Sequence, residues 1–296
     1  MPTIVTGAGG FVGAALLLQL AEPPTVLHLA AADWLERVEG TRFAGAVVIH
    51  LAARVHARGD ADRLHDRDNR QKTAALARAA AHGGARRFVF LSSVKAMGEE
   101  TVGAPYTPQT PPEPRDAYGR SKLAAERELQ QIASGSALEH VIVRAPLVLG
   151  AGAKGNAAAL VRACDSPWPL PFGAVRNRRS FVHVGDLARL LVACGERPAA
   201  AGRTYLAAHR EPFSTPGLVA TVRAALGRPA RLWDIEPRRL EAMARLMGRG
   251  ESMRRLTRSL EVDPSAAERD LDWLASVPLA GAVDEMVASY RAERGR

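Results

Sequence analysis

Tyr118 and Lys122 are the two residues of this chain with the clearest potential for chemistry. They stand four positions apart in Asp116-Ala-Tyr-Gly-Arg-Ser-Lys122, in a chain where only four of the 40 basic residues are lysine. On a helix this spacing puts the phenol and the ammonium on one face, with their β-carbons about 5 to 6 Å apart. The ammonium would stabilise tyrosinate and lower the phenol pKa from its ordinary value of about 10. The pair predicts a tyrosine general acid, or else a surface pair on an amphipathic helix.

A glycine-rich turn follows directly on a short apolar strand at the N-terminus. Pro2-Thr-Ile-Val-Thr6 reads as the strand, Gly7-Ala-Gly-Gly10-Phe-Val-Gly13 as the turn, and residues 14–20 as a helix. Gly7 and Gly10 would allow a tight turn and a close approach to a pyrophosphate, and Gly13 would let the helix pack closely on the strand. The N-terminus of the helix supplies unpaired N–H groups. The segment predicts a dinucleotide site, with tight packing alone as the alternative.

The elements that would position these residues alternate between strand and helix. Apolar segments at 25–30, 46–51, 87–91 and 139–144 read as strands, and helical patterns cover 33–39, 61–81 and the segment after Asp116. This alternation predicts an α/β fold with a Rossmann-type doubly wound parallel sheet. Ser92 and Ser93 follow one of these strands, at the carboxyl edge where ligands bind in such folds.

The pattern loosens in the second half of the chain, where helices dominate. We expect residues 1–148 and 181–206 to form a dinucleotide-binding domain. Residues 149–180 and 207–296 would form a smaller, mostly helical substrate domain.

Composition limits the class of protein. The 296 residues are 47% apolar, and no run reaches the roughly 18 apolar residues of a membrane span. No signal peptide precedes the first strand, so we expect a cytoplasmic protein. Cys164 and Cys194 are too few for a disulfide framework and lack neighbours at metal-ligand spacing. We expect both to be buried, and we expect no bound metal.

The net charge of +9 raises the question of a polyanionic partner. Basic residues are scattered except in 237–258, where seven arginines accompany two glutamates and apolar residues recur at helical spacing. A solvated face, contact with a substrate diphosphate, a membrane surface and nucleic acid are the four interpretations of this segment. Only 5% of the residues are aromatic, and no aromatic interleaving supports nucleic acid, which we do not expect as a partner.

Together the motifs resemble the extended short-chain dehydrogenase/reductase family, of the NAD-dependent epimerase/dehydratase type that acts on nucleotide sugars. The resemblance covers nearly the whole chain. It rests on residues 6–13, 50–53, Asn69, Ser92-Ser93, Tyr118 with Lys122, Arg144-Ala-Pro146 and residues 179–186. The strings at 50–56 and 152–156 are most similar to the branch that reduces UDP-4-keto-6-deoxy-N-acetylhexosamines to UDP-N-acetylquinovosamine.

The resemblance implies a role for each motif. Tyr118 would protonate the C4 oxygen, Ser93 would bind the carbonyl oxygen, and Lys122 would hold the nicotinamide ribose and lower the phenol pKa. The cofactor, NAD or NADP, would contact Gly7, Gly10, Phe11, Val12, Gly13, Leu51, Ala52, Ala53, Asn69, Ser92, Tyr118, Lys122, Ala145 and Pro146. A UDP-sugar would contact Ser93, Tyr118, Lys154, Asn156 and Arg179. Related enzymes often pair as homodimers through the helices that correspond to 62–81 and 117–131.

One segment departs from the family pattern. Residues 14–49 are too few for the two strand–helix units that the family usually places there, and the alignment suggests that the second strand and its helix are missing. That unit normally ends in the residue that reads the adenosine ribose. Only Asp33 could take this place, so the sequence does not choose between NAD and NADP.

The sequence supports three functional hypotheses. The first is a UDP-sugar 4-ketoreductase in surface polysaccharide synthesis, and the second is a UDP-sugar 4-epimerase that uses the same three residues. The third is a catalytically impaired nucleotide-binding or scaffold protein with a shortened cofactor site.

Overall fold

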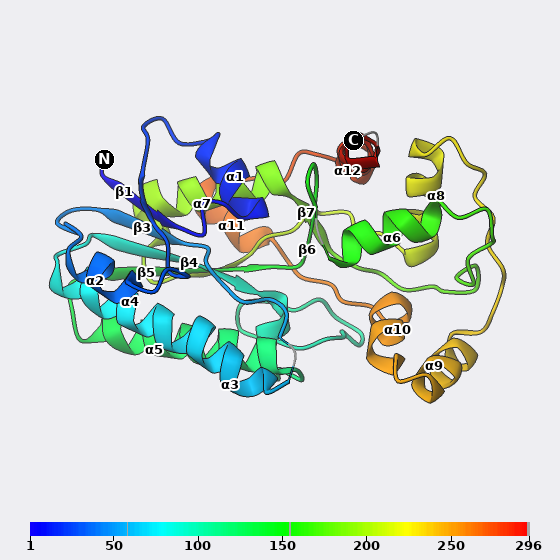
Figure 1. The fold of residues 1–296 in the computed structure, drawn as a ribbon, viewed down its shortest axis with the longest axis horizontal. Coiled ribbons are helices and arrows are strands. Elements are labelled where there is room, and N and C mark those ends of the chain that lie inside the picture. The colour runs from blue at the N-terminus through cyan, green and yellow to red at the C-terminus, as the bar shows by residue number, and fades with distance from the viewer. Residues whose placement is uncertain (58, 154, 295–296) are drawn as a thin grey trace.

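A six-stranded parallel sheet forms the centre of the structure, a computed structural model that describes residues 1–57, 59–153 and 155–294 (Figure 1). Its strand order is β2-β1-β3-β4-β5-β8, and every pair in it is parallel. The strands are β1 (Thr3–Thr6), β2 (Thr25–Leu27), β3 (Val47–His50), β4 (Arg87–Ser93), β5 (Glu139–Ala145) and β8 (Thr204–Leu206). The predicted doubly wound parallel sheet is therefore confirmed.

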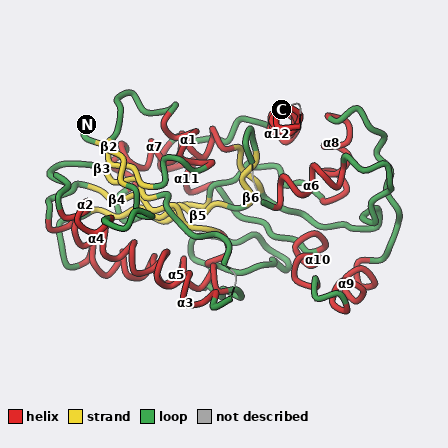
Figure 2. The backbone as a smooth tube through the Cα atoms, viewed as in Figure 1, coloured by secondary structure: helices red, strands yellow, loops and turns green. Residues whose placement is uncertain are grey.

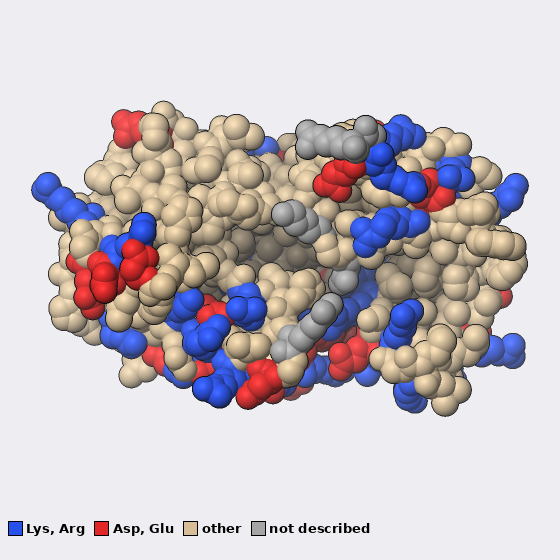
Figure 3. All heavy atoms as spheres, viewed as in Figure 1, with Lys and Arg blue, Asp and Glu red and all other residues tan. Residues whose placement is uncertain are grey.

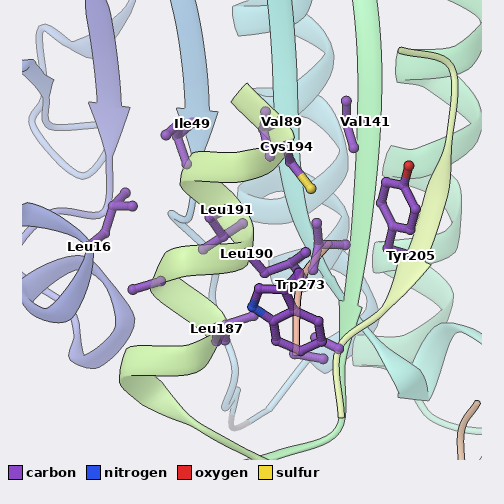
Figure 4. Close-up of a cluster of buried hydrophobic side chains, with 14 of the residues drawn as sticks. Leu16, Ile49, Val89, Val141, Leu187, Leu190, Leu191, Cys194, Tyr205 and Trp273 are labelled. Atoms are coloured by element: carbon purple, nitrogen blue, oxygen red, sulfur yellow. The ribbon is translucent and has the colours of Figure 1, made fainter. Parts of the chain in front are cut away.

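Helices cover both faces of the sheet (Figures 1 and 2). One face carries α1 (Phe11–Leu17), α7 (Val184–Glu196) and α11 (Ser265–Leu271), and the other carries α2 (Trp34–Glu39), α4 (Lys72–His82) and α5 (Ala117–Ser134). Successive strand residues point to opposite faces, so Ile49 packs with the first set and Val48 with the second. Figure 4 shows the first of these cores, where Leu187 and Cys194 of α7 meet strand residues. Both cysteines are buried and free, as predicted.

The long helix predicted over residues 61–81 is interrupted. α3 (Ala61–His65) continues through a π-helical turn at Asp66–Gln71 into α4. Such a turn is rare and frequently lies at a functional site. Here it carries Asn69, whose contacts are described with the site.

A second region extends from the carboxyl end of the sheet. It contains the parallel pair β6 (Leu147–Leu149) and β7 (Phe181–His183), with α6 (Asn156–Cys164), α8 (Thr215–Ala225), α9 (Pro237–Leu246), α10 (Gly250–Thr257) and α12 (Leu279–Arg294). These elements share a core of their own, in which Leu149 and Phe181 meet Val219 and Val283. No helix in the part of the chain that the structure describes is long and apolar enough to cross a membrane.

The packing of α11 differs from the expected division of the chain. Residues 207–296 were assigned to the substrate region, but Ala267 and Leu271 of α11 pack in the core of the sheet. Trp273 joins them, and its Nε1 donates a hydrogen bond to the Asp186 carbonyl oxygen at 3.0 Å. The chain therefore returns to the sheet after α10 before it ends in α12.

The shortened segment retains one strand and one helix. β2 pairs in parallel with β1, so it occupies the place beside β1 that the second strand has in the usual order 3-2-1-4-5-6. The piece that is missing in space is therefore the strand beyond it, whereas the sequence suggested that the second strand was lost. Which strand is missing is decided by how the strands pair, and an alignment of sequences does not contain that information.

Candidate active site

The first turn of α5 brings Tyr118 to the carboxyl end of β4. Asp116 caps this helix, because its Oδ1 accepts a hydrogen bond from the Gly119 N–H at 2.7 Å. Gly119 lies so close to the chain after β4 that a β-carbon there would stand 2.3 Å from the Lys95 carbonyl oxygen. Only glycine allows this approach, which sets Tyr118 beside Ser93, the last residue of β4.

Ser93 and Tyr118 line one cavity of about 630 Å³. Its wall takes residues from the sheet and from the second region, and most of these are apolar, including Leu147, Leu149, Phe213, Leu218, Leu256 and Leu260. A largely apolar concave site with a few convergent polar groups is the usual form of a small-molecule pocket. The face in Figure 3 is hollowed near the middle of the molecule.

The Tyr118 phenol is held in its protonated form. Burial raises its pKa well above the ordinary value, the Asp116 carboxylate raises it further, and a hydrogen bond with Ser93 partly offsets the two. A phenol in this state is able to give a proton to an oxygen that becomes negative.

The Lys122 side chain contacts β4. Its Nζ donates a hydrogen bond to the Leu91 carbonyl oxygen at 2.9 Å and lies 4.5 Å from the centre of the Phe90 ring. In this arrangement the ammonium is turned toward β4, and burial raises the phenol pKa. The predicted lowering of the phenol pKa by Lys122 stays a prediction for the protein with cofactor bound. Burial lowers the pKa of Lys122 itself to about 7, although Glu126 acts in the opposite direction.

Ser92 is turned away from the cavity. Its hydroxyl donates a 2.5 Å hydrogen bond to Glu126 of α5, and the same carboxylate receives two hydrogen bonds from Arg144. Both members of this ion pair are buried. Adjacent strand residues point to opposite faces, so only Ser93 of the two serines faces the cavity. The predicted contact of the Ser92 side chain with the cofactor is not supported by this orientation.

The glycine turn has the geometry of a dinucleotide cradle. Gly7 has φ +74°, and a β-carbon there would stand 2.7 Å from the Ala52 nitrogen, in the loop after β3. At Gly13 a β-carbon would stand 2.2 Å from the Gly7 carbonyl oxygen, and the Gly10 N–H closes the turn on that same oxygen at 3.0 Å. No side chain caps α1, and its first turn has no acidic residue. These features fit a pyrophosphate at the N-terminus of α1.

Phe11 and Val12 open α1 and are half-buried, and Leu51 to Ala53 pass directly beside the turn. Ala145 ends β5, and Pro146 lies on the cavity wall. The structure thus brings these predicted cofactor residues to one edge of the sheet. Their contact with a cofactor stays a prediction.

Asn69 holds the loop that follows β3 in place. It is buried in the π-helical turn, where its Oδ1 accepts from the Arg54 N–H at 2.7 Å and its Nδ2 donates to the Arg54 carbonyl oxygen at 3.0 Å. Nδ2 also donates to the Ser121 hydroxyl at 2.9 Å, on α5. These hydrogen bonds join the loop after β3 to α5 and give Asn69 a positioning role. Its contact with the cofactor, which the resemblance implied, stays a prediction.

His50 joins the end of β1, next to the glycine turn, to α4. It is fully buried, with Nδ1 at 2.6 Å from the Thr6 hydroxyl and Nε2 at 2.8 Å from the Thr73 hydroxyl. Because Thr73 donates its own proton to the Asn69 carbonyl oxygen, it accepts from Nε2, which assigns the proton of the neutral ring. Burial lowers the His50 pKa to about 3, and the ring stays neutral.

Two arginines of the second region also line the cavity. Arg179 lines it, half-buried, and donates to the Arg258 carbonyl oxygen at 3.0 Å. Arg255 of α10 also lines it and pairs with Glu99 at 3.0 Å. Burial lowers the pKa of Arg179 to about 10, so its guanidinium stays charged at neutral pH. Lys154 lies outside the described residues, as does the side chain of Asn156.

Several residues of the site escaped sequence reasoning. Lys95 pairs with Asp116 and with Glu99, and both Lys95 and Asp116 lie on the cavity wall. Their only signal was their place beside Ser93 and Tyr118. The sequence did not distinguish Arg255 from the other arginines of residues 237–258. Contact with a diphosphate was one interpretation of that segment. His65 packs edge-on to the Tyr118 ring at 5.8 Å between ring centres, and nothing in its sequence context indicated this.

Comparisons with known proteins agree with this geometry. The model of the NAD dependent epimerase/dehydratase family matches residues 3–208. A UDP-glucose 4-epimerase of Vibrio cholerae is 32% identical over 293 residues, which cover 91% of this chain and 89% of that protein. A UDP-glucose 4-epimerase of Corynebacterium glutamicum is 25% identical, over 85% of this chain and 88% of its own length.

Solved structures share the fold. The UDP-glucuronic acid 4-epimerase from Bacillus cereus, solved in complex with NAD, superposes with a TM-score of 0.76 at 18% identity and covers 99% of each chain. The UDP-glucose 4-epimerase from Thermotoga maritima, solved with UDP-glucose, gives a TM-score of 0.77 at 19% identity and covers 99% of this chain and 100% of that one. At these identities the similarity establishes the architecture.

Proposed function

This chain belongs to the NAD dependent epimerase/dehydratase family, and from that membership we propose that it is a UDP-sugar 4-epimerase. The observation that carries the proposal is the shared cavity, which is lined by Ser93 and Tyr118 from the sheet and by Arg179 and Arg255 from the second region. Guanidinium groups suit a diphosphate because they bind it bidentately. The relatives that cover most of this chain are named for the same reaction on UDP-glucose.

In this proposal one residue of the cavity transfers the proton, and the others orient the substrate. When bound, NAD would accept a hydride from C4 of the sugar and return it. Tyr118, as the phenolate, would take the proton of the C4 hydroxyl as C4 loses its hydride, and the phenol so formed would give the proton back as the ketone is reduced. The positive charge that the oxidised cofactor brings when bound would offset the burial that keeps the phenol protonated in the protein alone. Ser93 would donate a hydrogen bond to the same oxygen and fix its direction. Arg179 and Arg255 would hold the diphosphate while the keto sugar rotates between the two half-reactions.

A 4-ketoreductase is the second candidate, and one observation favours it. An epimerase must keep its reduced cofactor between the two half-reactions, whereas a reductase exchanges it. Here β2 ends at Leu27 and is followed by His28, without a carboxylate for the adenosine ribose, and Asp33 is already paired with Arg37 at 2.8 Å. A weaker hold on the cofactor suits exchange. A non-catalytic role is set aside, because the family is enzymatic and Ser93, Tyr118 and Lys122 are intact.

The epimerase and the reductase differ in whether they need cofactor added to the solution. We expect the purified protein to interconvert UDP-N-acetylglucosamine or UDP-glucose with its 4-epimer without added cofactor, measured by chromatography of the nucleotide sugars. Tyr118→Phe should lower turnover at least about 100-fold, in the range of general acid catalysis, and leave NAD binding intact. Consumption of NADH with a UDP-4-keto-6-deoxy sugar, and no epimer formation, would favour the reductase. Unchanged turnover in Tyr118→Phe would contradict both.

A further inference from the structure

Helix α9 has more apolar surface than the protein covers. Leu240 and Ala244 are buried, whereas Met243, Leu246 and Met247 are 57%, 90% and 65% exposed. The three exposed residues are spaced at i, i+3 and i+4, so they form one stripe beside the buried face. We call Met243, Leu246 and Met247 the apolar stripe. Exposed apolar patches rimmed by polar residues mark sites that bind another protein, a membrane or a ligand.

The same corner of the molecule is strongly basic. Arg238, Arg239, Arg245 and Arg249 are all exposed. Within the described part of the chain only Arg239 has a carboxylate within 4 Å, which is Glu236 at 3.6 Å. Glu241, the acidic residue inside α9, is turned inward onto Arg258 and Thr257. Figure 3 shows basic side chains around this corner, at the lower right where Figure 1 places α9. The four arginines are the basic group of the proposal.

We propose that the α9 corner docks on an anionic lipid bilayer. The apolar stripe would enter the boundary between headgroups and acyl chains, and the basic group would lie at the level of the lipid phosphates. Long arginine side chains suit this place, because their stems stay in apolar surroundings while the guanidinium reaches the phosphate. Self-association through the same patch is disfavoured, since it would bring two unpaired arginine groups together. Nucleic acid offers no apolar phase for the stripe.

The docking surface adjoins the active site without belonging to it. α9 packs on α10, and α10 contributes Arg255 and Leu256 to the cavity wall. The residues of the stripe and of the basic group do not line that cavity. The proposal is therefore independent of the reaction, and its failure would leave the proposed function untouched.

The test is sedimentation of the full-length protein with lipid vesicles. We expect the protein to bind vesicles that contain phosphatidylglycerol at low salt, to bind pure phosphatidylcholine vesicles far less, and to dissociate as salt screens the charges. A basic residue near an anionic surface contributes about fivefold to partitioning, so the double variant R238Q/R239Q should bind about 25-fold less. Leu246→Glu should also reduce binding, because it places a charge inside the apolar stripe.

Matched controls separate this surface from general charge and exposure. Leu18 is 84% exposed at the end of α1, and Leu18→Glu should bind vesicles like the wild type. Arg42 and Arg127 are exposed elsewhere, and R42Q/R127Q removes the same charge as R238Q/R239Q. Equal loss in the two double variants, equal binding to both kinds of vesicle, or no binding by the wild type would overturn the proposal. So would a dimer, seen by sedimentation velocity, that Leu246→Glu dissociates. Unchanged NAD affinity in each variant verifies its folding.

Discussion

At the scale of single residues, burial changes the chemistry of Lys122 strongly. The scarcity of lysine in the chain drew attention to it, and the pairing with Tyr118 suggested an ammonium beside the phenol. In the structure it is buried between β4 and α5, where desolvation lowers its pKa to about 7. Lys122 therefore changes charge close to neutral pH. Its hydrogen bond to Leu91 is compatible with the neutral and the charged amine.

This environment predicts a pH dependence of stability. Between about pH 7 and the ordinary lysine pKa of 10.5 the unfolded chain holds a proton at Lys122 that the folded chain has lost. The contribution of Lys122 to the free energy of unfolding therefore rises with pH across this window, and it is lost as pH falls toward 7. Urea unfolding at pH 7 and at pH 9 measures it. The wild type should gain more free energy of unfolding than Lys122→Met, and an equal gain would mean that the amine titrates normally.

At the scale of elements, the glycine turn couples β1, α1 and the loop after β3. Gly13 lets α1 pack against the Gly7 carbonyl oxygen, and Gly7 lets residues 51–53 pass beside the turn. Gly9, in the same turn, has no atom within 4 Å of where a β-carbon would stand. Packing therefore requires glycine at positions 7 and 13, whereas a side chain at Gly9 would meet no neighbouring atom.

Gly13 and Gly9 offer a matched pair of substitutions. Gly13→Ala should weaken NAD binding by about tenfold to 100-fold, because relieving the 2.2 Å contact moves α1 at a typical overpacking cost of about 1 to 3 kcal/mol. Gly9→Ala should bind NAD like the wild type. Calorimetric titration with NAD measures both, with thermal unfolding as the check on folding. Equal affinities in the two variants would show that close packing at Gly13 does not shape the cofactor site.

At the scale of the whole molecule, a cluster of charges joins the sheet to the second region beside the cavity. Arg255 of α10 reaches Glu99 at 3.0 Å and Asp116 at 3.5 Å, and Lys95 reaches the same two carboxylates. These side chains are between 17% and 29% exposed, so each pair is worth at most about 1 kcal/mol. The cluster matters more for the shape and charge of the cavity than for stability.

Arg255 and its neighbour Arg254 allow a test of this role. Both pair with glutamates across the same junction, but only Arg255 lines the cavity. Arg255→Gln should weaken UDP binding by about tenfold to 100-fold, because a charged hydrogen bond is worth about 1.5 to 3 kcal/mol. Arg254→Gln should leave UDP affinity near the wild-type value, and both should keep NAD affinity, as measured by calorimetry. If the two variants lose UDP affinity equally, net charge explains the effect and a direct contact does not.

The sequence by itself determined the parts of this protein that neighbouring residues encode. The alternation of strand and helix, the glycine turn after β1 and the spacing of Tyr118 and Lys122 are local patterns, and a local period is set by backbone geometry. The choice of Ser93 over Ser92 for the carbonyl oxygen was also readable, through the family resemblance. The direction of the Lys122 side chain was not, because helix spacing places two residues on one face but does not choose their rotamers.

Only the tertiary structure decided which distant residues meet. It brought Arg179 and Arg255 to one cavity, tied Asn69 to Arg54 and Ser121, and returned α11 to the sheet. It also put β2 beside β1, although the alignment indicated a different loss. Each of these contacts joins segments far apart in the chain, and it depends on which strand pairs with which and which helix faces are left to be covered. That selection is made by the free energy of burying the whole core at once, so no single stretch of sequence contains it.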